Sequence, residues 1–165
     1  MKNIYFPDEE IAEDDLYFIC YMVEKVARLL KQRNKYVVNT IGPNGLRHLL
    51  SCAQVLHCEN PLKVANDWIE NYSLEAGNFD ITNVNAELAK VIPTELDMGA
   101  VYQRLIMDTL SSKEDYVDGI LRVYNSPICE TIDNYNGSAF YEPSYVIARA
   151  YQNGGFWLRL QFALD

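Results

Sequence analysis

The sequence predicts a mainly α-helical protein, a multi-helix bundle arranged in two small lobes. Apolar residues recur at helical spacing in both halves of the chain, as expected for helices that bury one face. Helix-capping side chains are followed by prolines at several positions, a pattern typical of helix starts. With 165 residues, 49% of them hydrophobic, the chain can bury enough apolar surface to fold. We expect lobes at residues 1–73 and 96–165, joined by a linker at 74–95 where apolar residues are sparse.

The N-terminal lobe contains the strongest predicted helix, which begins near Asp14. Acidic residues stand at its start and three basic residues, Lys31, Arg33 and Lys35, at its end, which suits the helix dipole. Its buried face is predicted from residues at helical spacing: Leu16, Ile19, Cys20, Val23, Val26, Ala27 and Leu30.

Further helices are predicted in the same lobe. Residues 36–41 fit either a short strand or a helical elbow, and turn residues at 42–45 separate them from a helix at 46–57. Asn60 and Pro61 form a cap followed by a first-turn proline, which predicts a helix at 62–72.

The C-terminal lobe is also predicted to be helical. Asp97 can cap one helix, and Ser112 with Asp115 resembles a capping box for the next. Pro127 and Pro143 stand where two more helices would begin.

A minor β element is predicted at the termini. Apolar residues alternate with others at 158–164, which is the period of a strand, and residues 3–6 also look extended. The two segments could pair within one chain or between the chains of a dimer. The C-terminal segment could instead fold onto the helices as an apolar extension.

The charge distribution bears on the kind of partner. A net charge of −9 disfavours non-specific attraction to nucleic acid, because such contacts depend on clustered lysine and arginine. Residues 1–16 hold six acidic residues against one lysine, whereas residues 17–73 hold seven basic residues against four acidic ones. Any nucleic-acid surface would therefore lie in the first half. No segment resembles a signal peptide or a membrane-spanning helix, so we expect a cytoplasmic protein without membrane contacts.

No pattern of residues points to catalysis. The chain lacks glycine-rich phosphate loops and the GxSxG and HExxH motifs, so we predict a protein that is not an enzyme and has no cofactor. His48 and Cys52 have the spacing of two metal ligands on one helix face, but a closed zinc site needs four converging ligands, and we predict no metal. The four cysteines lie apart among apolar residues, and we expect buried, reduced thiols.

Two groups of residues are candidates for binding. Segment 133–141 combines small turn residues with aromatic rings, a composition typical of protein-binding surfaces. For protein binding we single out His57, Tyr135, Asn136, Phe140 and Tyr141. Residues 34–57 could alternatively form a helix-turn-helix, in which Arg47 and His48 would face DNA.

Short segments of the first half carry a resemblance to a known family. Phe18-Ile19-Cys20 opens the first helix, and Gln54-Val55-Leu56-His57-Cys58 closes the third segment. With these segments, residues 16–73 resemble the bacterial family called domain of unknown function 3791, in which the corresponding helix end reads Asp-Val-Leu-His-Thr. Residues 101–106 and 124–128 resemble companion segments of the same kind of protein. Such domains often occur beside ADP-ribosyltransferase-like domains, so the resemblance implies a toxin-partner or regulatory role.

We therefore predict a non-enzymatic protein-binding or regulatory module, such as the antitoxin-like partner of a bacterial toxin. The expected partner is another protein, and a homodimer is a further prediction. One alternative is a DNA-binding transcriptional regulator that uses residues 34–57. A second alternative is a small enzyme in which His57 acts with a carboxylate of the C-terminal lobe.

Overall fold

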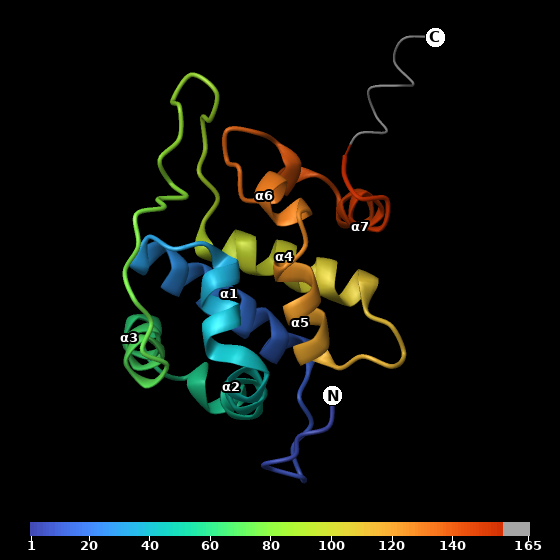
Figure 1. The fold of residues 1–165 in the computed structure, drawn as a ribbon. Helices are drawn as coiled ribbons and strands as arrows, with labels where there is room; N and C mark the ends of the chain where they lie inside the picture. The colour runs from blue at the N-terminus through green and yellow to red at the C-terminus, as the bar shows by residue number, and fades with distance from the viewer. Residues whose placement is uncertain (157–165) are drawn as a thin grey trace.

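The computed structural model describes residues 1–156, which form a bundle of helices (Figure 1). The predicted fold class, a mainly α multi-helix bundle, is confirmed, because these residues contain seven α-helices, one 3-10 helix and no strand. In chain order the elements are α1 (Glu13–Leu30), α2 (Asn34–Leu56), α3 (Pro61–Asn71), α4 (Glu95–Thr109), α5 (Tyr116–Tyr124), α6 (Ile128–Ile132), η1 (Ala139–Tyr141) and α7 (Ser144–Gln152).

Helix α1 lies inside the bundle and packs against α2, α3 and α4 (Figure 1). The helix begins where the Asp15 carboxylate accepts a hydrogen bond from the Ala12 backbone N–H at 2.8 Å. It ends at Lys31, whose φ of 51° places it in the left-handed region. Eleven of its 18 residues are buried, and they include the whole apolar stripe predicted from the sequence. Other elements therefore cover α1 on most of its surface.

Helix α2 consists of two helical segments that run in different directions (Figure 1). They meet at Gly42, which has a φ of 72° that favours glycine, and Pro43 follows at the start of the second segment. Residues 36–41 are helical. The sequence was compatible with either a short strand or a helical elbow at this segment. The turn residues predicted at 42–45 thus produce a kink between two helical segments rather than a separate loop.

The long connection between α3 and α4 has no helix or strand, and part of it projects beyond the helices (Figure 1). It contains residues 74–94 of the predicted linker at 74–95, and residue 95 is the first residue of α4. Backbone hydrogen bonds hold its first part against the end of α1, from Gly77 N to Leu30 O at 2.7 Å and from Phe79 N to Lys31 O at 2.8 Å. The Arg33 guanidinium also lies 4.1 Å from the centre of the Phe79 ring. This part of the connection is therefore fixed against the bundle.

Buried apolar side chains from both predicted lobes form one hydrophobic core. Helices α1 and α4 approach each other closely across the predicted boundary, at Gly99. A Cβ atom at this position would lie 2.9 Å from the Cα and backbone nitrogen of Tyr21, so the two helices can approach this closely because the residue is glycine. The first half of the chain thus packs directly on the second.

The predicted β element is not supported among residues 1–156. Residues 3–6 form a turn, because the Asn3 side-chain oxygen accepts hydrogen bonds from the backbone N–H groups of Tyr5 and Phe6, both at 3.0 Å. The only β-type pairing in the described chain is one isolated bridge between Lys2 and Glu10. The other predicted strand, at 158–164, lies outside the described residues.

The cysteines and the helix lengths bear on two further expectations. Cys20 and Cys129 are buried free thiols as predicted, whereas Cys58 is exposed in the turn after α2 and Cys52 is half-buried.

Among residues 1–156 no helix combines the length and the apolar character that crossing a bilayer requires.

Gly99→Ala tests the close approach of α1 and α4. The added methyl group would press on the Tyr21 backbone, which cannot move as a flexible side chain can, so the free energy of unfolding should fall by about 1–3 kcal/mol. Urea denaturation measures this change. Gly137→Ala is the matched control, since its Cβ would meet only the Asn134 carbonyl oxygen at 3.4 Å. A stabilised Gly99→Ala protein, as helix propensity alone would produce, would contradict this packing.

Candidate functional site

The predicted aromatic segment is partly core. Tyr135 and Phe140 are buried, with their ring centres 5.3 Å apart. The side chain of Tyr141 is 63% exposed and its ring packs on Phe140. Asn136 is also exposed, and its side-chain oxygen accepts a hydrogen bond from the Asn85 backbone N–H at 2.7 Å. Of the four residues singled out here, two offer accessible side chains.

His57 follows the last residue of α2 and contacts the first half of α1. Its ring lies 4.4 Å from that of Phe18, and its Nε2 atom lies 3.9 Å from an oxygen of Asp15. Tyr135 instead contacts Glu24. Glu24 lies nine positions after Asp15 on α1, which corresponds to about 14 Å along the helix. The structure therefore separates His57 from the aromatic segment, and the carboxylate beside His57 comes from the first half of the chain.

The two residues considered for DNA binding lie on the second segment of α2. Arg47 donates a hydrogen bond to the Asp115 carboxylate at 2.6 Å and so ties α2 to the start of α5. The exposed His48 ring packs edge-on against Tyr5 at 5.3 Å. Arg47 would have to leave its ion pair to contact a base, so DNA binding through these residues stays a prediction.

A buried carboxylate, Glu24, is the centre of a polar network that the sequence did not predict. Glu24 is 1% exposed, and its Oε1 atom accepts hydrogen bonds from Arg28 at 2.9 Å and from the Tyr135 hydroxyl at 2.6 Å. Its Oε2 atom accepts from the Asn34 side-chain amide at 2.8 Å. Three donors, including one positive charge, therefore compensate the loss of water around this carboxylate.

A second carboxylate, Asp133 at the end of α6, joins the same network. It accepts a hydrogen bond from the Tyr102 hydroxyl at 2.6 Å and another from the Asn34 amide at 3.2 Å. Asn34 therefore donates to both carboxylates through one nitrogen. Burial, and then the negative charge of Glu24, raise the pKa of Asp133 to about 8, well above the ordinary value of a carboxyl group.

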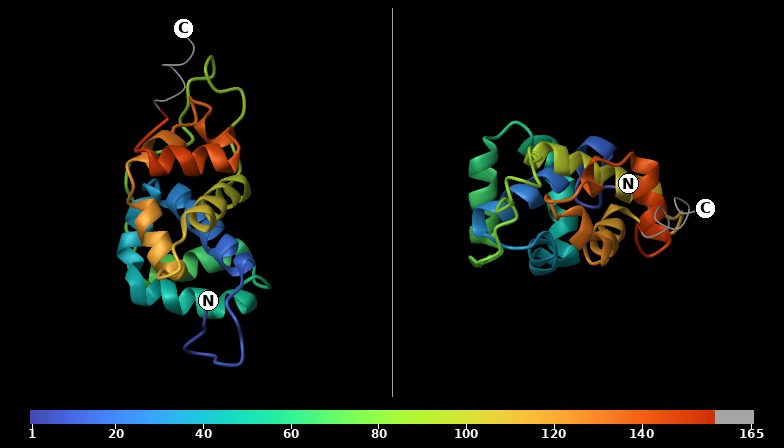
Figure 2. Two further views of the ribbon diagram at one scale, coloured as in Figure 1. Left: turned by 90° about the vertical axis from the view of Figure 1, so that its right-hand side faces the viewer. Right: turned by 90° about the horizontal axis from the view of Figure 1, so that it is seen from above.

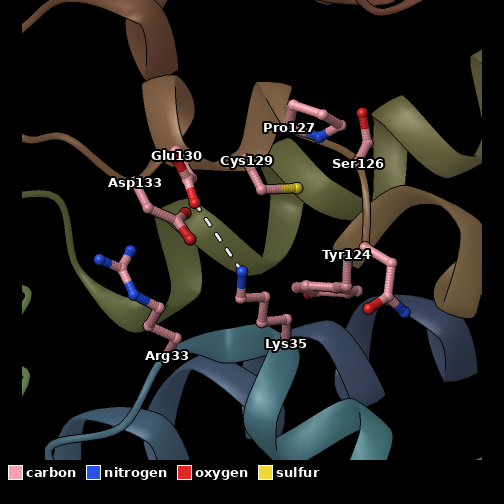
Figure 3. Close-up of a pocket in the computed structure, with 9 residues that line it drawn as sticks. Arg33, Lys35, Tyr124, Ser126, Pro127, Cys129, Glu130 and Asp133 are labelled. Atoms are coloured by element: carbon pink, nitrogen blue, oxygen red, sulfur yellow. Dashed lines mark ion pairs between the residues drawn. The ribbon is translucent and has the colours of Figure 1, made fainter.

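A polar hollow of about 160 Å³ lies beside Asp133 (Figure 3). Lys35 and Glu130 face each other across it, with 3.8 Å between their charged atoms. Burial raises the pKa of the Cys129 thiol in its wall to about 12, which makes this thiol a poor nucleophile at neutral pH. A neighbouring hollow of about 310 Å³ shares Arg33, Glu130 and Asp133. The two hollows have room and polar groups for small polar molecules.

Metal ligands do not gather anywhere in residues 1–156, where no three side chains of His, Cys, Asp or Glu converge on one point. His48 and Cys52 have the spacing of two ligands, and the Cys52 Sγ atom lies 3.9 Å from the His48 Nε2 atom.

One sequence signal could have identified the buried network. Glu24 lies between Cys20, Val23 and Ala27 on the predicted buried face of α1, where a charged residue requires a partner. Arg28, four positions later, is the partner that helical spacing places nearest. The partners from distant segments, such as Tyr135, leave no comparable signal.

Four large apolar side chains lie exposed within nine residues at the end of the α3–α4 connection. We call them the 88–96 patch, and their exposed fractions range from 39% to 66%: Leu88, Val91, Ile92 and Leu96. The C-terminal end of the patch is anchored to α1, because Arg28 donates to the Pro93 carbonyl oxygen at 2.8 Å and the Tyr17 hydroxyl donates to that of Leu96 at 3.3 Å. Thr94 and Asp97 form a capping box at the start of α4 within it.

Comparison of the chain with protein-family models gives no match, and comparisons with curated proteins and with solved structures give none either.

Asp133→Asn tests the protonation of the half-buried carboxyl group of Asp133. Its folded-state pKa lies above the unfolded value, so the folded protein holds a proton that the unfolded chain loses between pH 3.8 and about 8. The stability of the wild-type protein should therefore fall as the pH rises through this window, by up to about 1.4 kcal/mol per pH unit. The Asp133→Asn side chain cannot ionise, so the stability of this variant should lack this fall with rising pH. Urea denaturation at a series of pH values measures it.

The control for this experiment is Glu130→Gln on the same helix, where the side chain is 66% exposed. It should keep the wild-type pH profile. An Asp133→Asn protein with the same pH profile as the wild type would show that Asp133 ionises normally.

Tyr135→Phe tests the hydrogen bonds to Glu24. It removes one of the three donors to a buried carboxylate and should lower the free energy of unfolding by about 1–3 kcal/mol, measured by urea denaturation. Tyr141→Phe, at an exposed ring, should change it by less than about 0.5 kcal/mol. Equal effects of the two changes would argue against the network.

Proposed function

We propose that the protein is a non-enzymatic, cytoplasmic protein-binding module whose partner contacts the 88–96 patch. The observation that carries this proposal is the exposure of its four large apolar side chains on a segment that is anchored to α1 at Pro93 and Leu96. Contiguous exposed apolar groups are typical of protein interaction sites. A surface that is already ordered also loses less entropy when a partner binds.

The aromatic segment predicted from the sequence lies next to this connection. The hydrogen bond from Asn85 N to the Asn136 side chain joins the two segments a few residues before the patch. The exposed ring of Tyr141 comes from the same aromatic segment. Asn136 therefore lies beside the connection that carries the patch.

The resemblance of residues 16–73 to domain of unknown function 3791 suggests which partner to test. An antitoxin-like role, in which this chain binds a bacterial toxin, is the form of the proposal that follows from it. The net charge of −9 would favour association with a basic partner.

A double substitution, Leu88→Ser with Val91→Ser, tests the patch. The tagged full chain is used to isolate a partner from its native cells, and the purified partner is titrated against each variant by calorimetry. Loss of two apolar contacts should weaken binding about tenfold or more. Leu62→Ser, at a 50% exposed leucine on α3, is the control and should bind as the wild type does. The absence of any stoichiometric protein partner, or equal affinity of patch variant and wild type, would refute the proposal.

A further inference from the structure

The N-terminal loop, residues 2–11, presents three consecutive apolar side chains to solvent. Ile4, Tyr5 and Phe6 are between 46% and 58% exposed. Three adjacent apolar residues at this exposure are unusual at a surface unless another molecule covers them.

Hydrogen bonds and burial hold this loop in one shape. The Asn3 side chain is buried, and its amide donates to the Ser51 carbonyl oxygen at 3.2 Å. Its oxygen accepts hydrogen bonds from the backbone N–H groups of Tyr5 and Phe6, and the Tyr5 ring packs edge-on against His48 at 5.3 Å. At the other end Ile11 is buried, and its N–H donates to the Met1 carbonyl oxygen at 3.0 Å. The apolar residues are therefore displayed on an ordered loop.

Negative charge surrounds these apolar residues along the chain. Five acidic side chains within residues 8–14 are exposed, and Lys2 is the one basic residue in residues 1–14: Asp8, Glu9, Glu10, Glu13 and Asp14. Beside the loop, Ile4 also lines a hollow of about 430 Å³ whose wall includes Lys2 and Arg47, and Arg47 is paired with Asp115. The five exposed acidic side chains, which we call the acidic border, thus outnumber the basic ones near the apolar residues.

The N-terminal loop and the α3–α4 connection project from opposite ends of the molecule (Figures 1 and 2). The loop extends from the end where α1 begins, and the α3–α4 connection extends past α6. Contact at one end therefore leaves the other end accessible.

We propose that the N-terminal loop is a second protein-docking surface, separate from the 88–96 patch, whose partner carries an apolar cleft bordered by lysine and arginine. Tyr5 and Phe6 are the kind of residue that dominates binding energy when buried in a cleft. The acidic border attracts basic side chains and repels anionic lipid, which favours a protein over a membrane surface. The inference rests on the proposed function in one respect: both take the binding partner to be a protein.

The test begins by identifying what the loop contacts. Phe6→p-benzoylphenylalanine in the full-length protein is photo-crosslinked in native cells, and the attached protein is identified and purified. Its binding kinetics are then measured for the wild type and for two variants, Ile4→Ser with Phe6→Ser, and Asp8→Lys with Glu9→Lys. Glu70→Lys with Glu75→Lys is the matched charge control, because both side chains are exposed on other elements. Thermal unfolding checks that every variant folds.

Each variant has an expected result. The apolar variant should lower affinity about tenfold or more. The charge variant should slow association about tenfold at low salt, with little difference at high salt, whereas the matched charge control should not. Leu88→Ser with Val91→Ser should leave this binding intact.

Several results would overturn the inference. They are crosslinking to a second copy of the chain alone, the absence of any crosslink, and binding that neither loop variant weakens. Binding lost only in the Leu88→Ser and Val91→Ser protein would also overturn it, while leaving the proposed function in place. A failure to find any protein partner at either surface would refute both this inference and the proposed function.

Discussion

The carboxylate of Glu24, buried in the middle of α1, has partners from three parts of the chain. Arg28 comes from the same helix, Asn34 from the start of α2 and Tyr135 from the segment after α6. Through Asn34 the network reaches Asp133 and, from there, Tyr102 on α4. A buried charge without these groups would be strongly destabilising, so α2, α4 and α6 must assemble around α1 in this arrangement for the core to close. The polar centre therefore specifies the fold along with the apolar side chains.

The same network also positions the features exposed at the surface. Asp133 lies between the core and the polar hollow, so the Asn34–Asp133 contact defines one wall of that hollow (Figure 3). Arg28 binds Glu24 through Nε and the Pro93 carbonyl oxygen through a terminal nitrogen. Through Arg28, Pro93 in the 88–96 patch is thereby connected to the buried Glu24 carboxylate.

Local patterns identified most elements but not how they come together. The apolar stripe of α1 was predicted correctly, and Asn60 caps α3 as expected, with its oxygen accepting from Leu62 N at 2.9 Å. Cap positions were less accurate, since Thr94 rather than Asp97 caps α4. The extended reading of residues 3–6 was wrong, because the Asn3 side chain takes the backbone donors that a strand would use. The contact of Glu24 with Tyr135 joins residues 111 positions apart, and periodicity carries no information about such pairs.

The shared role of Arg28 joins the surface to the core. The same guanidinium that compensates the buried Glu24 carboxylate also donates to the Pro93 carbonyl oxygen and lies near the Tyr135 hydroxyl at 3.3 Å. A shorter or neutral side chain at this position would leave a buried negative charge without its positive partner, and it would leave the connection before α4 without its donor. One arginine on α1 thus links the interior of the bundle to a segment that has no regular secondary structure.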